Sequence, residues 1–230
     1  MRFDILTLFP SVIEPYVNSG VIGRAHTIKK SIQIGIHNIR DYSHDSHNKV
    51  DDAPFGGGAG MILQIEPIYY TLEHILKEYP DTNKHIILTK AGAPIFNQEK
   101  AISLGKEYNH IIFICGRYEG IDARVEEYLI HESLSIGQFI LTGGELPALT
   151  MLDAISRHIP DVLGNEESLS EESWTYTNTK EYPQYSRPAE FTPDNPHLII
   201  EDAPNTWTVP DILLSGNHQR IHEWKQNQKK

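Results

Sequence analysis

The sequence has 230 residues, a formal net charge of −11, 39% hydrophobic residues and one cysteine. This length suits one large domain, or one domain with a small appendage. A single cysteine cannot form an internal disulfide or, alone, a zinc site, and no apolar run approaches the roughly 18 residues of a membrane span. The start of the chain lacks the basic and long apolar stretches of a signal peptide. We therefore expect a cytoplasmic protein with no membrane attachment.

The acidic residues are unevenly distributed. Residues 161–205 contain ten aspartates and glutamates against Lys180 and Arg187, a net charge of −8, which leaves −3 for the rest of the chain. An evenly spread charge of this size would argue against a nucleic-acid partner. Because most of it lies in one segment, the remaining surface can still carry a basic, nucleic-acid-binding region.

The first two thirds of the chain alternate apolar runs with amphipathic segments. The opening residues, MRFDILTLFP, favour a strand, and residues 66–79 and 97–108 have helical patterns. Three stretches, 84–92, 109–120 and 135–147, each combine a continuous apolar run with a glycine-containing loop. Such runs are typical of parallel strands covered on both faces. The sequence predicts an α/β domain that binds its ligand at loops beyond the strand ends.

The second of these stretches contains the only cysteine. Cys115 ends the apolar run IIFIC, whereas a nucleophilic cysteine needs an exposed position and an activating base, so we predict a buried core residue. Each glycine loop alone is explained by a tight turn, but three in succession favour a ligand held by backbone groups, such as an adenine. No G-x-G-x-x-G follows a strand and no P-loop motif occurs, so we predict no dinucleotide or triphosphate site.

Further segments have two readings each. Residues 47–61, HNKVDDAPFGGGAGM, are either a flexible surface loop or a loop that faces the substrate. Their upstream histidines match no usual zinc-ligand spacing. Residues 147–160 predict a helix with Pro147 in its first turn and with its end at Pro160. On this helix Arg157 could simply pair with Asp153.

The remaining third is polar. Residues 161–180 have the composition of a linker, in which an acidic side chain needs no role beyond solvation. Residues 181–205 are dense in proline and predict irregular structure. A short helix follows, for which Ser215 is the expected N-cap.

Six motifs occur in order over nearly the whole chain: GVIGRA, HNKVDDAPFGGGAGM, CGRYEGIDARV, SIGQFILTGGELPAL, EYPQYSRP and VPDILLSGNHQRIHEWK. Together they resemble the bacterial tRNA (guanine-N1)-methyltransferases, which modify the guanosine 3′ of the anticodon and belong to the trefoil-knotted (SPOUT) methyltransferases. The resemblance implies a knotted α/β fold, a homodimer with its active site at the subunit interface, and tRNA as substrate. It implies a catalytic domain over residues 1–160, a linker over 161–180 that orders over the target base, and a small helical tRNA-binding domain over 181–230.

The same resemblance assigns the site residues. It implies that S-adenosylmethionine lies in three knot loops, at Leu88, Thr89, Gly92, Gly116, Tyr118, Glu119, Gly120, Ile136, Gly137, Gln138, Phe139, Ile140, Leu141, Gly143 and Gly144. It implies that substrate contacts come from Asp52, Gly57, Gly58 and His218. Magnesium dependence is a family expectation, although no ligand set for the ion is legible in the sequence.

The chemistry requires a base and a cation. Guanine N1 carries a proton that must leave as the methyl group arrives, and negative charge then builds on O6. The family's base is an aspartate in a D-S-F stretch, which matches Glu172-Ser173-Trp174 here and makes Glu172 the candidate base. An ungapped count back from Pro183 places Ser173 there instead. Arg157 matches the family's arginine and would stabilise O6.

Three departures from the family pattern stand out. The first knot loop reads LTKAG where the family usually has serine-proline-glutamine-glycine, so Lys90 and Ala91 are unusual there. The segment over residues 191–207 is longer, and the chain stops soon after Trp224. Two other functions stay open: a knotted RNA methyltransferase acting on another base or a ribose hydroxyl, and a non-catalytic RNA-binding module.

Overall fold

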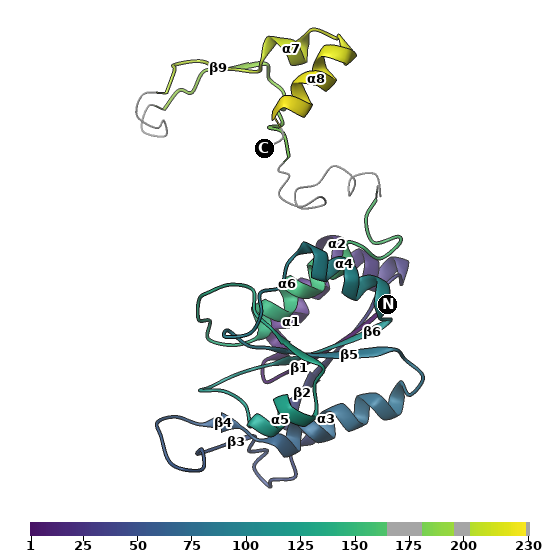
Figure 1. Cartoon of the computed structure of the whole chain (residues 1–230), viewed down its shortest axis with the longest axis vertical. Coiled ribbons are helices and arrows are strands. Elements are labelled where there is room, and N and C mark those ends of the chain that lie inside the picture. The colour runs from purple at the N-terminus through teal and green to yellow at the C-terminus, as the bar shows by residue number, and fades with distance from the viewer. Residues whose placement is uncertain (165–180, 196–202, 229–230) are drawn as a thin grey trace. The chain divides into compact units, whose positions relative to one another are not determined.

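A computed structural model describes residues 1–164, 181–195 and 203–228 (Figure 1). The chain divides into two compact units, Met1–Glu166 and Glu167–Lys230.

The first unit is built on a parallel sheet of five strands. In chain order these are β1 (Arg2–Thr7), β2 (Gln33–Asn38), β5 (Lys84–Thr89), β6 (His110–Cys115) and β7 (Glu132–Leu134). Their order across the sheet is β2-β1-β6-β5-β7, and every neighbouring pair is parallel. The predicted α/β class with a mostly parallel sheet is confirmed, as are the strands expected at the start of the chain and in residues 84–92 and 109–120.

Helices cover both faces of this sheet (Figure 1). One face packs against α1 (Pro10–Val17), α2 (Gly20–Arg24), the π-helical turn η1 (Ala25–Lys29), α4 (Gln98–Glu107) and α6 (Glu145–Ser156). The other packs against the 3-10 turn η2 (Ile39–Tyr42), α3 (Ile65–Glu78) and α5 (Ala123–Tyr128). Two apolar cores result, one on each side of the sheet, which explains why β1, β5 and β6 carry apolar residues on both faces.

The helices expected at residues 66–79 and 97–108 are confirmed as α3 and α4. In α3, Ile68, Leu72 and Ile75 are buried against the sheet, as their helical spacing predicts. Burial of each such side chain contributes roughly 1.5–3 kcal/mol to folding, before the entropy of ordering is subtracted. The helix is therefore held mainly by its apolar face.

The expectation of a strand in residues 135–147 was wrong. The strand β7 lies just before this stretch, and the apolar residues that follow form a loop in which Phe139 is 52% and Ile140 84% exposed. An apolar run can supply either a buried strand or an exposed contact surface, and composition does not distinguish them. In α6, Pro147 lies in the first turn, as predicted, but the helix ends at Ser156, short of Pro160.

The second unit contains a small hairpin and two helices among its described residues. Strand β8 (Glu190–Phe191) pairs antiparallel with β9 (Trp207–Thr208), and the Phe191 and Trp207 rings lie 5.6 Å apart. The strand β8 lies within the segment that was expected to be irregular. The sequence did not predict this strand because its partner, β9, is distant along the chain. Helices α7 (Asp211–Leu214) and α8 (His218–Gln228) follow.

The expected N-cap of the last helix was also wrong. Ser215 follows α7, and its hydroxyl donates to the Ile212 carbonyl, whereas Asn217 Oδ1 accepts from the Arg220 amide and so caps α8. Within the described parts of the chain, no helix has the length and apolar character needed to cross a bilayer.

Candidate active site

The three glycine loops meet at one edge of the sheet. The first loop (residues 89–92) follows β5, the second (116–120) follows β6 and the third (135–144) follows β7. Because parallel strands have their carboxyl ends at the same edge, the loops line a single cavity of about 490 Å³. Every predicted cofactor-binding residue except Gln138 lines this cavity. Their contact with a cofactor stays a prediction.

Gly144 is the point at which the loops pack together. Its amide donates to the Gly116 carbonyl over 2.9 Å, which joins the third loop to the second. A Cβ atom at Gly144 would lie 2.0 Å from Thr89 Oγ1 and 2.7 Å from the Gly116 nitrogen. No side chain fits there without moving backbone, so glycine at this position is required by the close approach of three loops.

A buried carboxylate anchors the loops from behind. Glu145, at the start of α6, is 4% exposed and accepts a 2.9 Å hydrogen bond from the Thr7 hydroxyl at the end of β1. Arg117 of the second loop lies 3.6 Å from the other Glu145 oxygen and donates to the Thr142 carbonyl of the third loop. Neither Arg117 nor Glu145 was expected from the sequence to be a site residue, although an acidic residue at the start of an otherwise apolar helix is an available signal.

The segment over residues 47–61, for which the sequence leaves a substrate-facing role open, is attached to the second glycine loop. Strands β3 (Asp51–Asp52) and β4 (Ile62–Leu63) form its base, and the Leu63 amide donates to the Gly120 carbonyl over 3.0 Å. The Glu119 amide likewise donates to the Met61 carbonyl. This attachment places the segment beside the cavity.

Three predicted substrate contacts lie in this attached segment. The exposed Asp52 carboxylate accepts hydrogen bonds from the Ala53 amide and from Lys49 Nζ. Both hydrogen bonds lower the pKa of this carboxyl group. Gly57 and Gly58 lie at the exposed tip with φ of 80° and 135°, values that favour glycine. The fourth predicted contact, His218, begins α8 in the second unit.

Arg157 lies at the opposite end of α6 from Glu145. Its amide donates to the Asp153 carbonyl, and the Asp153 carboxylate accepts a 2.6 Å hydrogen bond from the Tyr16 hydroxyl. That bond raises the pKa of Tyr16 to about 12. Arg157 does not line the cavity of its own chain. The candidate base Glu172, and its alternative Ser173, lie outside the described residues.

Cys115 is a core residue, as predicted. It is 1% exposed, and burial, with a smaller contribution from Glu145, raises the pKa of its thiol well above the ordinary value. A buried thiol with a raised pKa carries little of the thiolate that nucleophilic chemistry needs. Residues 109–120 therefore contribute their loop to the site and their cysteine to the core.

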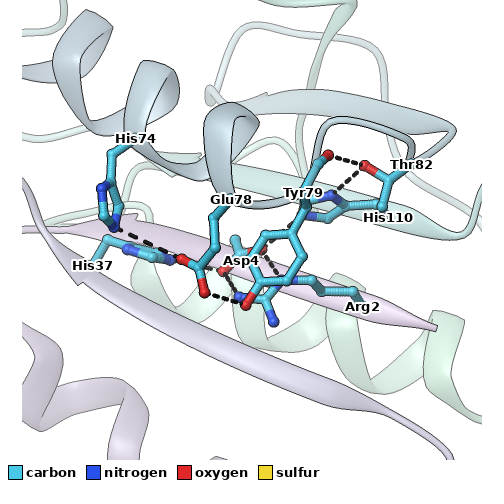
Figure 2. Close-up of polar contacts among 8 residues, drawn as sticks. All are labelled: Arg2, Asp4, His37, His74, Glu78, Tyr79, Thr82 and His110. Atoms are coloured by element: carbon cyan, nitrogen blue, oxygen red, sulfur yellow. Dashed lines mark hydrogen bonds and ion pairs between the residues drawn. The ribbon is translucent and has the colours of Figure 1, made fainter.

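A second polar cluster lies on the face of the sheet that α3 covers (Figure 2). Asp4 is fully buried and accepts hydrogen bonds of 2.6–2.8 Å from Arg2, His37 and His110. Burial alone would raise the pKa of Asp4, but these three donors outweigh it and hold the pKa well below its ordinary value. All four side chains come from β1, β2 and β6. The Asp4 carboxylate is closed to solvent and saturated with donors, unlike the charged groups of the loop-lined cavity.

Comparison with known proteins gives a consistent family assignment. The family model of tRNA (guanine-1)-methyltransferase TrmD matches residues 1–230. A tRNA (guanine-N(1)-)-methyltransferase of Clostridioides difficile (strain 630) is 43% identical over 228 residues, covering 99% of this chain and 92% of the relative. A protein of the same name from Staphylococcus carnosus (strain TM300) is 45% identical over 229 residues, covering 100% of this chain and 86% of the relative. The chain belongs to the tRNA (guanine-1)-methyltransferase family.

Proposed function

We propose that this protein transfers a methyl group from S-adenosylmethionine to N1 of the guanosine 3′ of the anticodon in tRNA. The observation that carries the proposal is the convergence of three glycine loops on one cavity, in a chain that matches the family over its whole length. Because its substrate is tRNA, we expect it to act in the cytoplasm.

The cavity suits S-adenosylmethionine in size and lining. Its volume of about 490 Å³ falls within the usual range for cofactor sites. The lining combines apolar side chains with glycine backbone at Gly116, Gly143 and Gly144, which leaves amide and carbonyl groups accessible to an adenine. When bound, the cofactor supplies an electrophilic methyl group on a sulfonium sulfur. The loops hold and orient that group and exclude water from it.

Two side chains act on the guanine. We assign removal of the N1 proton to Glu172, or to the position of Ser173 if the ungapped alignment holds, and only the glutamate can take that proton unaided. Arg157 places its cation near O6 and stabilises the negative charge that develops there. Magnesium, which the family resemblance implies, would lower the pKa of N1 when bound. Among the described residues, no group of three or more histidine, cysteine, aspartate or glutamate side chains is placed to hold the ion.

A homodimer explains the position of Arg157. The helix α6 has 12 residues, about 18 Å, and its first turn packs on the glycine loops while Arg157 follows its far end. One chain therefore keeps Arg157 away from its own cavity, and we propose that a second copy brings its Arg157 to that cavity. The exposed side chains of Phe139, Ile140 and Leu146 are suited to such a contact.

The remaining parts of the proposal concern tRNA and topology. We propose that the segment bearing Asp52, Gly57 and Gly58 contacts the substrate and that the second unit, with His218, grips the anticodon arm. We also propose that residues 161–180 close over the target base. The packing of the third loop against the second at Gly144 supports the trefoil knot of the family.

Product identity tests the function directly. The purified protein is incubated with S-adenosylmethionine and an unmodified tRNA, and the digested product is analysed for modified nucleosides. We expect 1-methylguanosine, and none when the target guanosine is replaced by adenosine. A methylated ribose or another methylated base would support a different knotted methyltransferase. Absence of both transfer and cofactor binding would support an RNA-binding module.

A further inference from the structure

The described wall of the cofactor cavity carries four charged side chains, and their charges cancel. They are the cations Lys90 and Arg117 and the carboxylates Glu119 and Glu126. Lys90 Nζ lies 2.5 Å from Glu126 Oε2, so the ammonium in the first loop is neutralised by a residue of α5. Both side chains remain partly exposed, at 50% and 37%, and both residues line the cavity.

Glu126 connects the elements that carry all three loops. It follows the second loop on α5, pairs with Lys90 of the first, and accepts a 2.8 Å hydrogen bond from Ser133 Oγ on β7, which precedes the third. These two donors, Lys90 first and Ser133 second, lower the pKa of the Glu126 carboxyl and keep it ionised. The Lys90 amide also donates to the Leu134 carbonyl, so the lysine is held from both ends.

The ion pair of Lys90 and Glu126 also lies between two cavities. Lys90 and Glu126 line the cofactor cavity and a neighbouring cavity of about 380 Å³, whose wall includes His131 and Glu132. The ion pair is thus part of the partition between them. Loss of either partner would leave one unpaired charge in the wall of the cofactor cavity.

We propose that Glu126 is a specificity-determining residue that neutralises Lys90 so that the cavity accepts a cationic methyl donor. The inference rests on the proposed function, because the donor is cationic only if it is a sulfonium. S-adenosylmethionine carries that positive charge and its demethylated product, S-adenosylhomocysteine, does not. Without the Glu126 carboxylate the wall of the cavity has a net charge of +1. Unit charges closer together than the Debye length, about 10 Å at 0.1 M salt, interact appreciably, so this wall would repel the cationic donor.

The test compares the two ligands on the same variants. Calorimetry gives the Kd of S-adenosylmethionine and of S-adenosylhomocysteine for the wild type and for Glu126→Gln, which keeps the side-chain length and an oxygen for Ser133. We expect Glu126→Gln to weaken S-adenosylmethionine about tenfold more than S-adenosylhomocysteine. Glu127→Gln is the matched control, since it is exposed on the same helix and does not line the cavity, and its ratio of the two Kd values should equal that of the wild type.

Removal of Lys90 should restore the wild-type ratio of the Kd values for S-adenosylmethionine and S-adenosylhomocysteine. In the double variant Lys90→Met/Glu126→Gln the unpaired ammonium is gone, so the ratio of the two Kd values should return to the wild-type value. Equal weakening of both ligands by Glu126→Gln, or no rescue by the double variant, would overturn the inference and indicate a purely structural role. If the wild type bound neither ligand, the proposed function would fall, and the inference with it.

Discussion

The buried cluster around Asp4 and the loop-lined cavity are two polar regions of the same sheet that differ in burial and in how fully their polar groups are hydrogen-bonded. Asp4 has no exposed surface and its two carboxylate oxygens accept four hydrogen bonds, from Arg2, His37 and His110. The cavity wall instead exposes its charged groups and much backbone at Gly116 and Gly120. A saturated buried network stabilises one arrangement of strands, whereas partly exposed polar groups remain free for a ligand.

The comparison predicts that residues of the two regions fail in different ways. Substitution near Asp4 should lower the stability of the fold and leave ligand affinity of the folded protein intact. Substitution in the loops should lower ligand affinity or turnover and leave stability nearly unchanged.

The largest effect should come from the base. Glu172→Gln removes the group that takes the N1 proton, so methyl transfer should fall by a factor on the order of 10²–10⁴ in single-turnover assays. Calorimetry should show an unchanged Kd for S-adenosylmethionine. Ser173→Ala is the matched variant and should retain turnover. If Ser173→Ala were inactive and Glu172→Gln active, the ungapped alignment would be correct.

The next effect concerns the buried cluster. Asp4→Asn keeps the side-chain volume but leaves Arg2 without its carboxylate, so the free energy of unfolding should drop by about 3–5 kcal/mol. Urea unfolding measures this change. The control is Asp41→Asn, at an exposed position, which should cost less than about 0.5 kcal/mol. A stable Asp4→Asn protein with lost cofactor affinity would break the comparison.

Acid should weaken the same cluster. The pKa of Asp4 is lowered in the folded protein, so its ionised form stabilises the fold above the unfolded carboxyl pKa, near about 4. That contribution is lost as the pH falls below this value toward the lower folded pKa. The wild type should therefore lose stability on acidification more steeply than Asp4→Asn. Parallel pH dependences of the two proteins would contradict this assignment.

The sequence was informative wherever function depends on local chain composition. Glycine loops after apolar runs predicted the cavity, and the end of an apolar run predicted that Cys115 is buried. Both follow from the properties of a few consecutive residues, so they can be recognised without the fold. The same reasoning mistook the exposed run at Phe139 for a strand, since an apolar composition does not reveal which side it will face.

Contacts between distant residues could not be predicted. Asp4 and His110 are 106 positions apart, and Thr7 and Glu145 are 138 apart, so their pairing depends on strand order. The pairing of Lys90 with Glu126 likewise depends on where α5 lies against the first loop. Arg157 illustrates a further limit, because its proposed site requires a second copy of the chain.

Titration of S-adenosylmethionine into Gly144→Ala tests most directly the claim that the three loops form the cofactor site. The added methyl group must displace Thr89 or the Gly116 backbone. Overpacking of this kind costs about 1–3 kcal/mol, which corresponds to a factor of roughly 5–150 in Kd when it is taken from binding. Gly164→Ala, which has open space around its Cβ, is the control. We expect the folded Gly144→Ala protein to lose affinity for S-adenosylmethionine, whereas Gly164→Ala should keep the wild-type affinity. Unchanged affinity in a folded Gly144→Ala protein would contradict it.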